Sequence, residues 1–188
     1  MPPQGNKLEQ IDFILKTHTH SGEDFTTKLR NQDFNLIART SLSAAATSII
    51  LDNIPTKKFL RILIAHDAKS GNGNSLLRFN NDSGNNYTFI EDGNGTARTS
   101  QSSIDLIDGV NNSLGYFYII DVINVFNLVK AVSAHSVARI TSAGTAQTRH
   151  RIHGTWVNIT SQITRIDLVA SANNLPANTS IDVFGSSE

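Results

Sequence analysis

The chain has 188 residues, of which 39% are hydrophobic and only 17% are charged, and this length suits one domain with an extension better than two full domains. Lysine plus arginine and aspartate plus glutamate both number 16, so no net positive field favours nucleic acid as a partner. The absence of cysteine excludes disulfides and thiolate zinc sites, and no stretch approaches the roughly 20 apolar residues that cross a bilayer.

Residues 1–40 differ from the rest of the chain in their pattern of apolar and polar residues. They contain a short apolar stretch at 8–15, the polar break THTHSGED and a second modest apolar run at 25–37. Eight residues are too few for a helix that is stable alone in water, so we expect a short extended or helical attachment segment that orders against a partner chain. The N-terminus lacks the long apolar run of a signal peptide, so we expect the protein to be made in the cytoplasm and not secreted by that route.

Beyond residue 40, short runs rich in Ile, Val, Phe and Thr alternate with clusters of Asn, Gly, Ser and Asp, which is typical of antiparallel β-proteins. Strands are predicted at 47–51, 59–66, 75–80, 86–91, 103–106, 114–123, 126–135, 148–158, 162–170 and 180–184. Many short strands at this spacing favour two packed sheets, because each apolar face must be covered by another. We therefore predict an all-β protein with an antiparallel two-sheet sandwich over residues 41–188.

Three of these segments carry a more specific expectation. The run FLRILIAH at 59–66 is apolar at nearly every position, which favours burial on both faces of the strand. The segments 75–80 and 86–91 are joined by NDSGN, whose Asn, Asp and Gly tolerate the positive φ of tight turns, so we predict a hairpin. In ITRIDLVA the apolar residues are not fully in phase, which allows a bulge or burial on two sides.

Two stretches, at 59–90 and 154–187, resemble a jelly-roll domain of tailed-bacteriophage structural proteins. The first part of the match is carried by Leu77, Arg78, Phe79, Asn80, Asp82, Asn86 and Tyr87. The second part is carried by Trp156, Ile163, Ile166, Leu168, Val183, Phe184 and Gly185. The resemblance implies a jelly-roll-like sandwich in a homotrimeric or otherwise multimeric, non-enzymatic component of a virion.

The resemblance leaves the position on the particle open. A tail-fibre or tail-tip protein would bind other virion proteins through residues 1–40 and present the sandwich to a host-surface glycan. Its Asn-rich loops at 70–75, 80–86, 91–101 and 171–179 would then contact the glycan through many weak hydrogen bonds, strengthened by avidity. A capsid decoration, cement or head-fibre protein would instead lay the same segment along the capsid. The third alternative is a virion-bound glycan hydrolase, for which the sequence offers no catalytic constellation.

His18 and His20 form a candidate metal site. The H-x-H pattern followed by Ser-Gly resembles the start of tail-fibre-like chains, and residues two apart project to the same side of an extended strand. At the axis of a trimer, three chains would supply six nitrogens, enough for an octahedral transition metal. The alternative is a polar loop whose histidines face water, because one pair alone cannot complete a site.

The segment TRHRIHGTW offers a candidate anion site. On a strand, Arg149, Arg151 and His153 share one face, which could bind an acidic sugar, while His150 and Ile152 share the other. The alternative is a solvated face whose charges protect a sheet edge.

The remaining candidates favour structural roles. Asp82, Glu91 and Asp92 are hard oxygen ligands suited to calcium, although turn formation explains them without metal. Trp156 is expected in the core rather than as a platform for sugar, and His66 and His135 each stand alone at a strand end. In GYFYIIDVI, adjacent aromatic residues face opposite ways, so only one of the two faces can form a binding surface.

Overall fold

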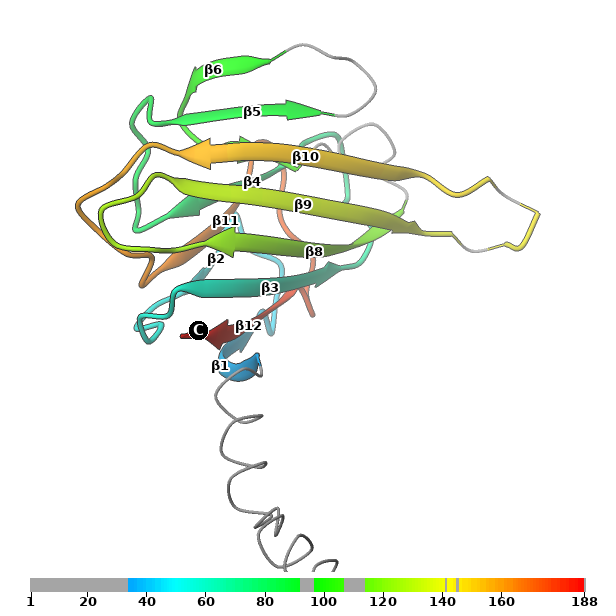
Figure 1. The fold of residues 1–188 in the computed structure, drawn as a ribbon. Helices are drawn as coiled ribbons and strands as arrows, with labels where there is room; N and C mark the ends of the chain where they lie inside the picture. Colours follow the sequence, from blue (N-terminus) through cyan, green and yellow to red (C-terminus); the bar gives the residue numbers. More distant parts are fainter. Residues whose placement is uncertain (1–33, 92–96, 107–113, 141, 145, 188) are drawn as a thin grey trace, which may run out of the picture. The chain divides into compact units, whose positions relative to one another are not determined.

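The computed structural model describes residues 34–91, 97–106, 114–140, 142–144 and 146–187. They all belong to the second of two units, Met1–Asp33 and Phe34–Glu188. The described residues form two sheets in which every pair of neighbouring strands is antiparallel (Figure 1). No helix in the described part of the chain is long and apolar enough to cross a membrane.

The larger sheet has eight strands in the order β1-β12-β3-β8-β9-β10-β5-β6. Their bounds are β1 (Asn35–Ser41), β3 (Phe59–His66), β5 (Tyr87–Glu91), β6 (Arg98–Gln101), β8 (Gly115–Ile123), β9 (Lys130–Arg139), β10 (Arg149–Trp156) and β12 (Ser180–Ser186). The smaller sheet has four strands in the order β2-β11-β4-β7. Their bounds are β2 (Ser48–Leu51), β4 (Ser75–Phe79), β7 (Ile104–Asp105) and β11 (Ile166–Ala170).

The core lies between the two sheets. Alternate residues of the long strands are buried, and the register places Ile62, Ile120, Ala134 and Ile152 side by side on the inner face of the larger sheet. Residues of the smaller sheet, such as Leu168, complete the same core. The predicted all-β class and the two antiparallel sheets are therefore confirmed, whereas a jelly-roll order of connections stays a prediction.

The predicted hairpin between 75–80 and 86–91 is wrong, although both strands exist. β4 pairs with β11 and β7 in the smaller sheet, while β5 pairs with β10 and β6 in the larger one. The turn has the expected positive φ, at 53° for Asn80 and 57° for Asn81, but it carries the chain from one sheet to the other. The Tyr87 hydroxyl fixes this crossing, because it accepts the Phe79 N–H at 2.9 Å and donates to the Asp82 carbonyl at 3.1 Å.

Burial on both faces of β3 is also wrong. Its inner residues are buried, but its outward residues are half-buried or, at Arg61, exposed. In β11 the out-of-phase pattern does reflect burial on two sides, because Ile166, Asp167 and Leu168 are all buried. The Asp167 carboxylate is stabilised there by hydrogen bonds from the Arg165 side chain.

Some strand boundaries differ from the sequence prediction. All of β1 except Ser41 lies within the segment 1–40 assigned to attachment, and β1 pairs with β12, so the compact unit that contains the sandwich begins at Phe34. β6 was not predicted. β9 begins at Lys130, because the apolar residues before it form an exposed turn rather than a strand.

Candidate functional site

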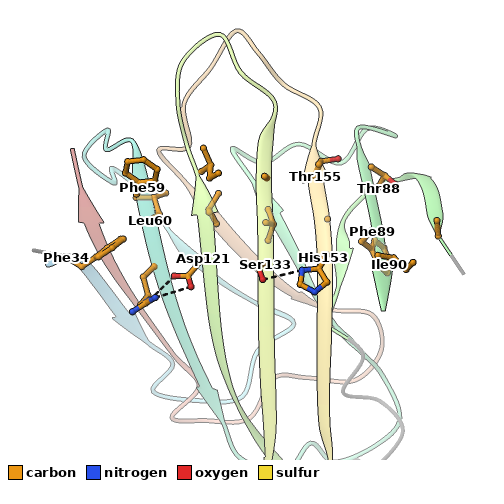
Figure 2. A pocket seen from close by; sticks show the side chains of 17 residues that line it. Phe34, Phe59, Leu60, Thr88, Phe89, Ile90, Asp121, Ser133, His153 and Thr155 are labelled. Atoms are coloured by element: carbon orange, nitrogen blue, oxygen red, sulfur yellow. Dashed lines mark hydrogen bonds and ion pairs between the residues drawn. The ribbon is translucent and has the colours of Figure 1, made fainter. Parts of the chain in front are cut away.

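The outer face of the larger sheet, which points away from the core, contains an open depression of about 730 Å³. It lies over β3, β8, β9, β10 and β5. Figure 2 shows Phe34 and Phe59 at one end of the depression and Thr88 and Ile90 at the other. No helix or loop of the described residues is needed to build its floor, which is the sheet itself.

Four polar side chains form a row across the middle of this floor. The strand register places Arg61, Asp121, Ser133 and His153 side by side on β3, β8, β9 and β10. We call these four residues the polar row. Arg61 donates to both carboxylate oxygens of Asp121, at 2.8 and 3.1 Å, and Ser133 Oγ lies 3.3 Å from His153 Nδ1 (Figure 2).

The Arg61–Asp121 pair in the polar row is exposed to solvent and can form further hydrogen bonds. The Arg61 and Asp121 side chains are 46% and 48% exposed. The hydrogen bonds and the charge of Asp121 raise the pKa of Arg61, so the guanidinium is charged at any ordinary pH. The two bonds use Nε and Nη2 and one lone pair on each oxygen, so Nη1 and the other lone pairs are left for a ligand.

An apolar border runs beside the polar row. The next set of outward positions, in register across the same strands, is Phe59, Ile123, Ala131, Thr155 and Thr88. Ile123 is 44% exposed. The Phe34 ring lies 5.4 Å from the Arg61 guanidinium, a cation–π contact that joins the aromatic end to the polar row.

The opposite side of the polar row is basic. As predicted, Arg149, Arg151 and His153 lie on one face of β10, which is the outer face, while Ile152 is buried on the inner one. The edge-protecting interpretation stays a prediction, because β10 lies between β9 and β5 but its described pairing with β5 covers only Ile152 to Trp156 and not Arg149 or Arg151. His135 is not isolated either, since its ring centre lies 6.4 Å from that of His153.

The carboxylates considered for calcium are used in structural contacts. Glu91 Oε1 lies 2.6 Å from His150 Nδ1. Asp82 accepts hydrogen bonds from Trp156 Nε1 at 2.7 Å, from the Asn86 amide and from the Gly84 N–H. Burial alone would raise the pKa of Asp82, but these bonds together lower it.

The arrangement of the described residues gives no support to the calcium or transition-metal interpretations. No group of three His, Asp or Glu side chains suited to a metal occurs among them. His18, His20 and Asp92 lie outside the part of the chain that the structure describes. The transition-metal site at a trimer axis therefore stays a prediction.

The aromatic residues of the core lie where the sequence indicated. Trp156 is fully buried and stacks on Tyr87 with ring centres 6.4 Å apart. Tyr116 and Tyr118 point into the core while Phe117 is on the outer face. His66 is buried against both tyrosines, at 6.0 and 5.9 Å between ring centres, so it packs in an aromatic cluster rather than standing alone.

The Asn-rich loops use many of their polar groups internally. Asn80 accepts the N–H groups of residues 164 and 165, and Asn74 donates to Asp105. Asn86 donates to Asp82, and Asn173 donates to the Asn72 carbonyl. These groups are therefore less available to a ligand than the polar row, which sequence reasoning missed. The signal for the row was a single charge within each of two apolar runs, FLRILIAH and GYFYIIDVI.

Comparison with known proteins gave no match for this chain, whether against family models, curated protein sequences or solved structures.

Proposed function

We propose that this chain is a non-enzymatic structural component of a bacteriophage virion, a tail-fibre or tail-tip protein whose sandwich binds a host-surface glycan. The virion context is supported by the sequence resemblance to phage jelly-roll proteins. Glycan binding is supported by the depression on the outer face of the larger sheet. The proposed contact surface is therefore the sheet face rather than the Asn-rich loops.

The observation that carries glycan binding is the polar row within its apolar surroundings. A sugar presents hydroxyl groups that both donate and accept hydrogen bonds, together with apolar C–H faces. The half-exposed Arg61–Asp121 pair offers donors and acceptors side by side. Phe34 and Phe59 offer apolar surface at one end. Such a mixture of apolar lining and a few convergent polar groups is typical of ligand sites.

The non-enzymatic part of the proposal is supported by the charge of the lining. Among the described residues that line the depression, Asp121 is the only carboxylate, and both its oxygens accept hydrogen bonds from Arg61. Glycoside hydrolysis ordinarily uses a pair of carboxyl groups flanking the scissile bond. The depression thus supports holding a glycan more than cleaving it.

Glycan binding is tested with the full chain on an immobilised panel of bacterial surface polysaccharides. We expect the wild type to bind at least one member and Asp121→Asn to weaken that binding about tenfold, the effect of losing a charge-assisted hydrogen bond. Asp182→Asn is the matched control, because Asp182 forms an equivalent two-bond pair with Arg39 outside the depression.

Two outcomes would contradict the proposal. The first is that the wild type binds no member of the panel, and the second is that Asp121→Asn binds as well as the wild type. Either result would show that the depression is not the glycan-binding site. Release of reducing ends from a bound polysaccharide would instead show an enzyme.

The capsid decoration alternative is favoured by a separate observation. Five apolar side chains are 40–56% exposed at one end of the sandwich, namely Phe126, Leu128, Val129, Val157 and Ile159. They belong to two loops joined by the hydrogen bond from the Asn127 N–H to the Ile159 carbonyl. Exposed apolar patches mark protein contacts. The number of copies per purified particle separates the two roles, since decoration requires far more copies than a tail appendage.

A further inference from the structure

We infer that an apolar patch at one end of the sandwich binds the surface of a lipid membrane, without spanning it. The patch, which we call the end patch, consists of Phe126, Leu128, Val129, Val157 and Ile159. None of these residues lines the depression on the outer face of the larger sheet. The inference therefore concerns a different surface from the glycan site and does not depend on it.

The end patch is formed by two loops that lie at the same end of the larger sheet. One loop joins β8 to β9 and the other joins β10 to β11, and both are at the left of the view in Figure 1. The Asn127 N–H donates to the Ile159 carbonyl at 3.0 Å, which holds the loops side by side. The five apolar side chains are 40–56% exposed, and such a concentration of exposed apolar surface marks a contact with protein or membrane.

The sequence of the two loops is free of charge. Residues 124–129 and 157–164 contain no aspartate, glutamate, lysine or arginine, although 17% of the whole chain is charged. Moving a charged side chain out of water is costly. These loops can therefore enter the apolar layer of a membrane without desolvating a charge of their own.

The backbone of the loops also suits a partner that forms no hydrogen bonds. The buried Lys130 ammonium donates to the carbonyls of Val125, Leu128 and Asn158 at 3.0, 2.6 and 2.9 Å. The Asn158 side-chain oxygen accepts the N–H groups of residues 160–161, at 3.0 and 2.9 Å. Chain segments in contact with lipid tails must satisfy their backbone groups internally, whereas a protein partner supplies hydrogen bonds across the interface. These bonds favour lipid as the partner.

Lysines beside the end patch match the negative charge of lipid headgroups. The Asn124 N–H and side-chain amide, at the start of the β8–β9 loop, donate to the carbonyls of Lys58 and Lys57, at 2.6 and 2.9 Å. Lys58 is exposed and Lys57 is half-buried. Behind the patch, the Lys130 ammonium bonds neutral carbonyls. Anionic lipids attract lysines that lie close to the membrane surface.

The carboxylates at this end of the sandwich are bonded to other groups of the chain. Asp167 accepts hydrogen bonds from Arg165, whose Nε also lies 3.6 Å from a carboxylate oxygen of Asp52. Asp82 accepts the Trp156 Nε1–H at 2.7 Å. Their bonded partners are thus Arg165 and Trp156 rather than the lysines beside the end patch.

The test measures flotation of the full chain with vesicles of phosphatidylcholine alone and of an equal mixture with phosphatidylglycerol. We expect binding to both, about tenfold tighter to the mixture, with a difference that shrinks as salt is added. Phe126→Ser/Leu128→Ser should bind both about tenfold more weakly, because two apolar side chains no longer leave water. Ile50→Ser/Ile119→Ser is the control, since these side chains are 43% and 38% exposed outside the end patch, and it should bind like the wild type.

The contribution of charge is tested separately. Lys57→Gln/Lys58→Gln should abolish the preference for the mixture and leave binding to phosphatidylcholine unchanged. Arg149→Gln/Arg151→Gln removes the same number of charges near the opposite end of β10, roughly 20 Å or more from Val157, and should keep the preference. Unfolding curves verify that each variant is folded.

A fluorescent label tests whether the loops themselves meet the lipid. The chain has no cysteine, so Val157→Cys and Ile119→Cys each provide a single site for an environment-sensitive fluorophore. Vesicles should shift the emission to shorter wavelength at position 157 and leave it unchanged at position 119. Equal shifts at the two positions would overturn the assignment to the end patch.

The remaining outcomes separate lipid from other partners. A wild type that binds neither kind of vesicle overturns the inference, as does a Phe126→Ser/Leu128→Ser variant that binds like the wild type. If vesicles stay unbound while sedimentation shows an oligomer that this variant dissociates, the end patch is instead a contact between copies of the chain. If vesicles stay unbound while the variant loses binding to purified capsids, the patch contacts a capsid protein. Each of these results leaves the glycan site untouched, because that site lies on another surface.

Discussion

The inner and outer faces of the larger sheet come from alternate residues of the same strands, and they differ sharply in chemistry. The inner row of Ile62, Ile120, Ala134 and Ile152 is entirely apolar. Each of these residues is the chain neighbour of one member of the polar row. Packing against the smaller sheet determines the inner row, whereas the outer row borders an open depression among the described residues. The proposed glycan recognition requires that the polar row contribute to binding and little to stability.

The largest loss of stability should come from Trp156→Ala. The indole is fully buried, contacts Phe79 and Tyr87, and donates to Asp82. We expect the free energy of unfolding to fall by about 3–5 kcal/mol, measured by urea denaturation. The adjacent Val157→Ala is the control, because Val157 is 56% exposed, and it should change stability by less than about 0.5 kcal/mol. Similar effects for the two variants would remove the distinction between buried and exposed positions.

The next largest effect should come from Lys130→Met. The buried ammonium donates to the carbonyls of Val125, Leu128 and Asn158 at 3.0, 2.6 and 2.9 Å, so it ties the β8–β9 turn to the β10–β11 loop. Methionine preserves the volume but leaves these carbonyls without their donor, which should cost about 2–3 kcal/mol. Lys58→Met, at an exposed position, is the control. A thermal unfolding curve unchanged by Lys130→Met would show that the ammonium does not hold the two loops.

A smaller effect is expected from Asp82, and it depends on pH. Its folded pKa is lowered from 3.8, so below that value the unfolded state binds more protons than the folded state. The stability that Asp82 contributes is present above about pH 4 and is lost as the pH falls through the folded pKa. Asp82→Asn should therefore flatten the acid limb of a plot of stability against pH, by less than about 1 kcal/mol in total.

The control for this titration is Asn85→Ala, at an exposed position of the same turn that carries no titrating group. It should retain the acid-dependent slope of the wild type. If Asp82→Asn and the wild type lose stability in parallel on acidification, the bonds from Trp156 and Asn86 do not favour the carboxylate form.

Features that depend on residues close in sequence could be predicted, whereas features that depend on contacts between distant strands could not. The strand at 59–66 was predicted with correct bounds, because an apolar run between turn residues is a local signal. The turn at 80–86 was recognised, but its role was not, because β5 pairs with β10, a strand that is distant in sequence, and not with β4. Phe126 and Leu128 were assigned to a strand because exposure cannot be read from an apolar run.

The candidate site was predicted only in part, for the same reason. Arg149, Arg151 and His153 were placed correctly on one face by the alternation of a single strand. The polar row could not be predicted, because its members come from four strands and meet only through the register between them. A site made of side chains that are distant in sequence requires the fold to be known first.

The smallest effect on stability should come from the polar row itself. The Arg61–Asp121 pair is half-exposed, and such pairs contribute at most about 1 kcal/mol; Ser133→Ala should change stability by less than about 0.5 kcal/mol. We expect the double variant Arg61→Met/Asp121→Leu to unfold within about 1 kcal/mol of the wild type, while glycan binding is lost. Urea denaturation and a binding assay on the same preparations measure both quantities. A loss of stability comparable to that of Trp156→Ala would mean that the row holds the sheet together, and its polar order would then need no ligand to explain it.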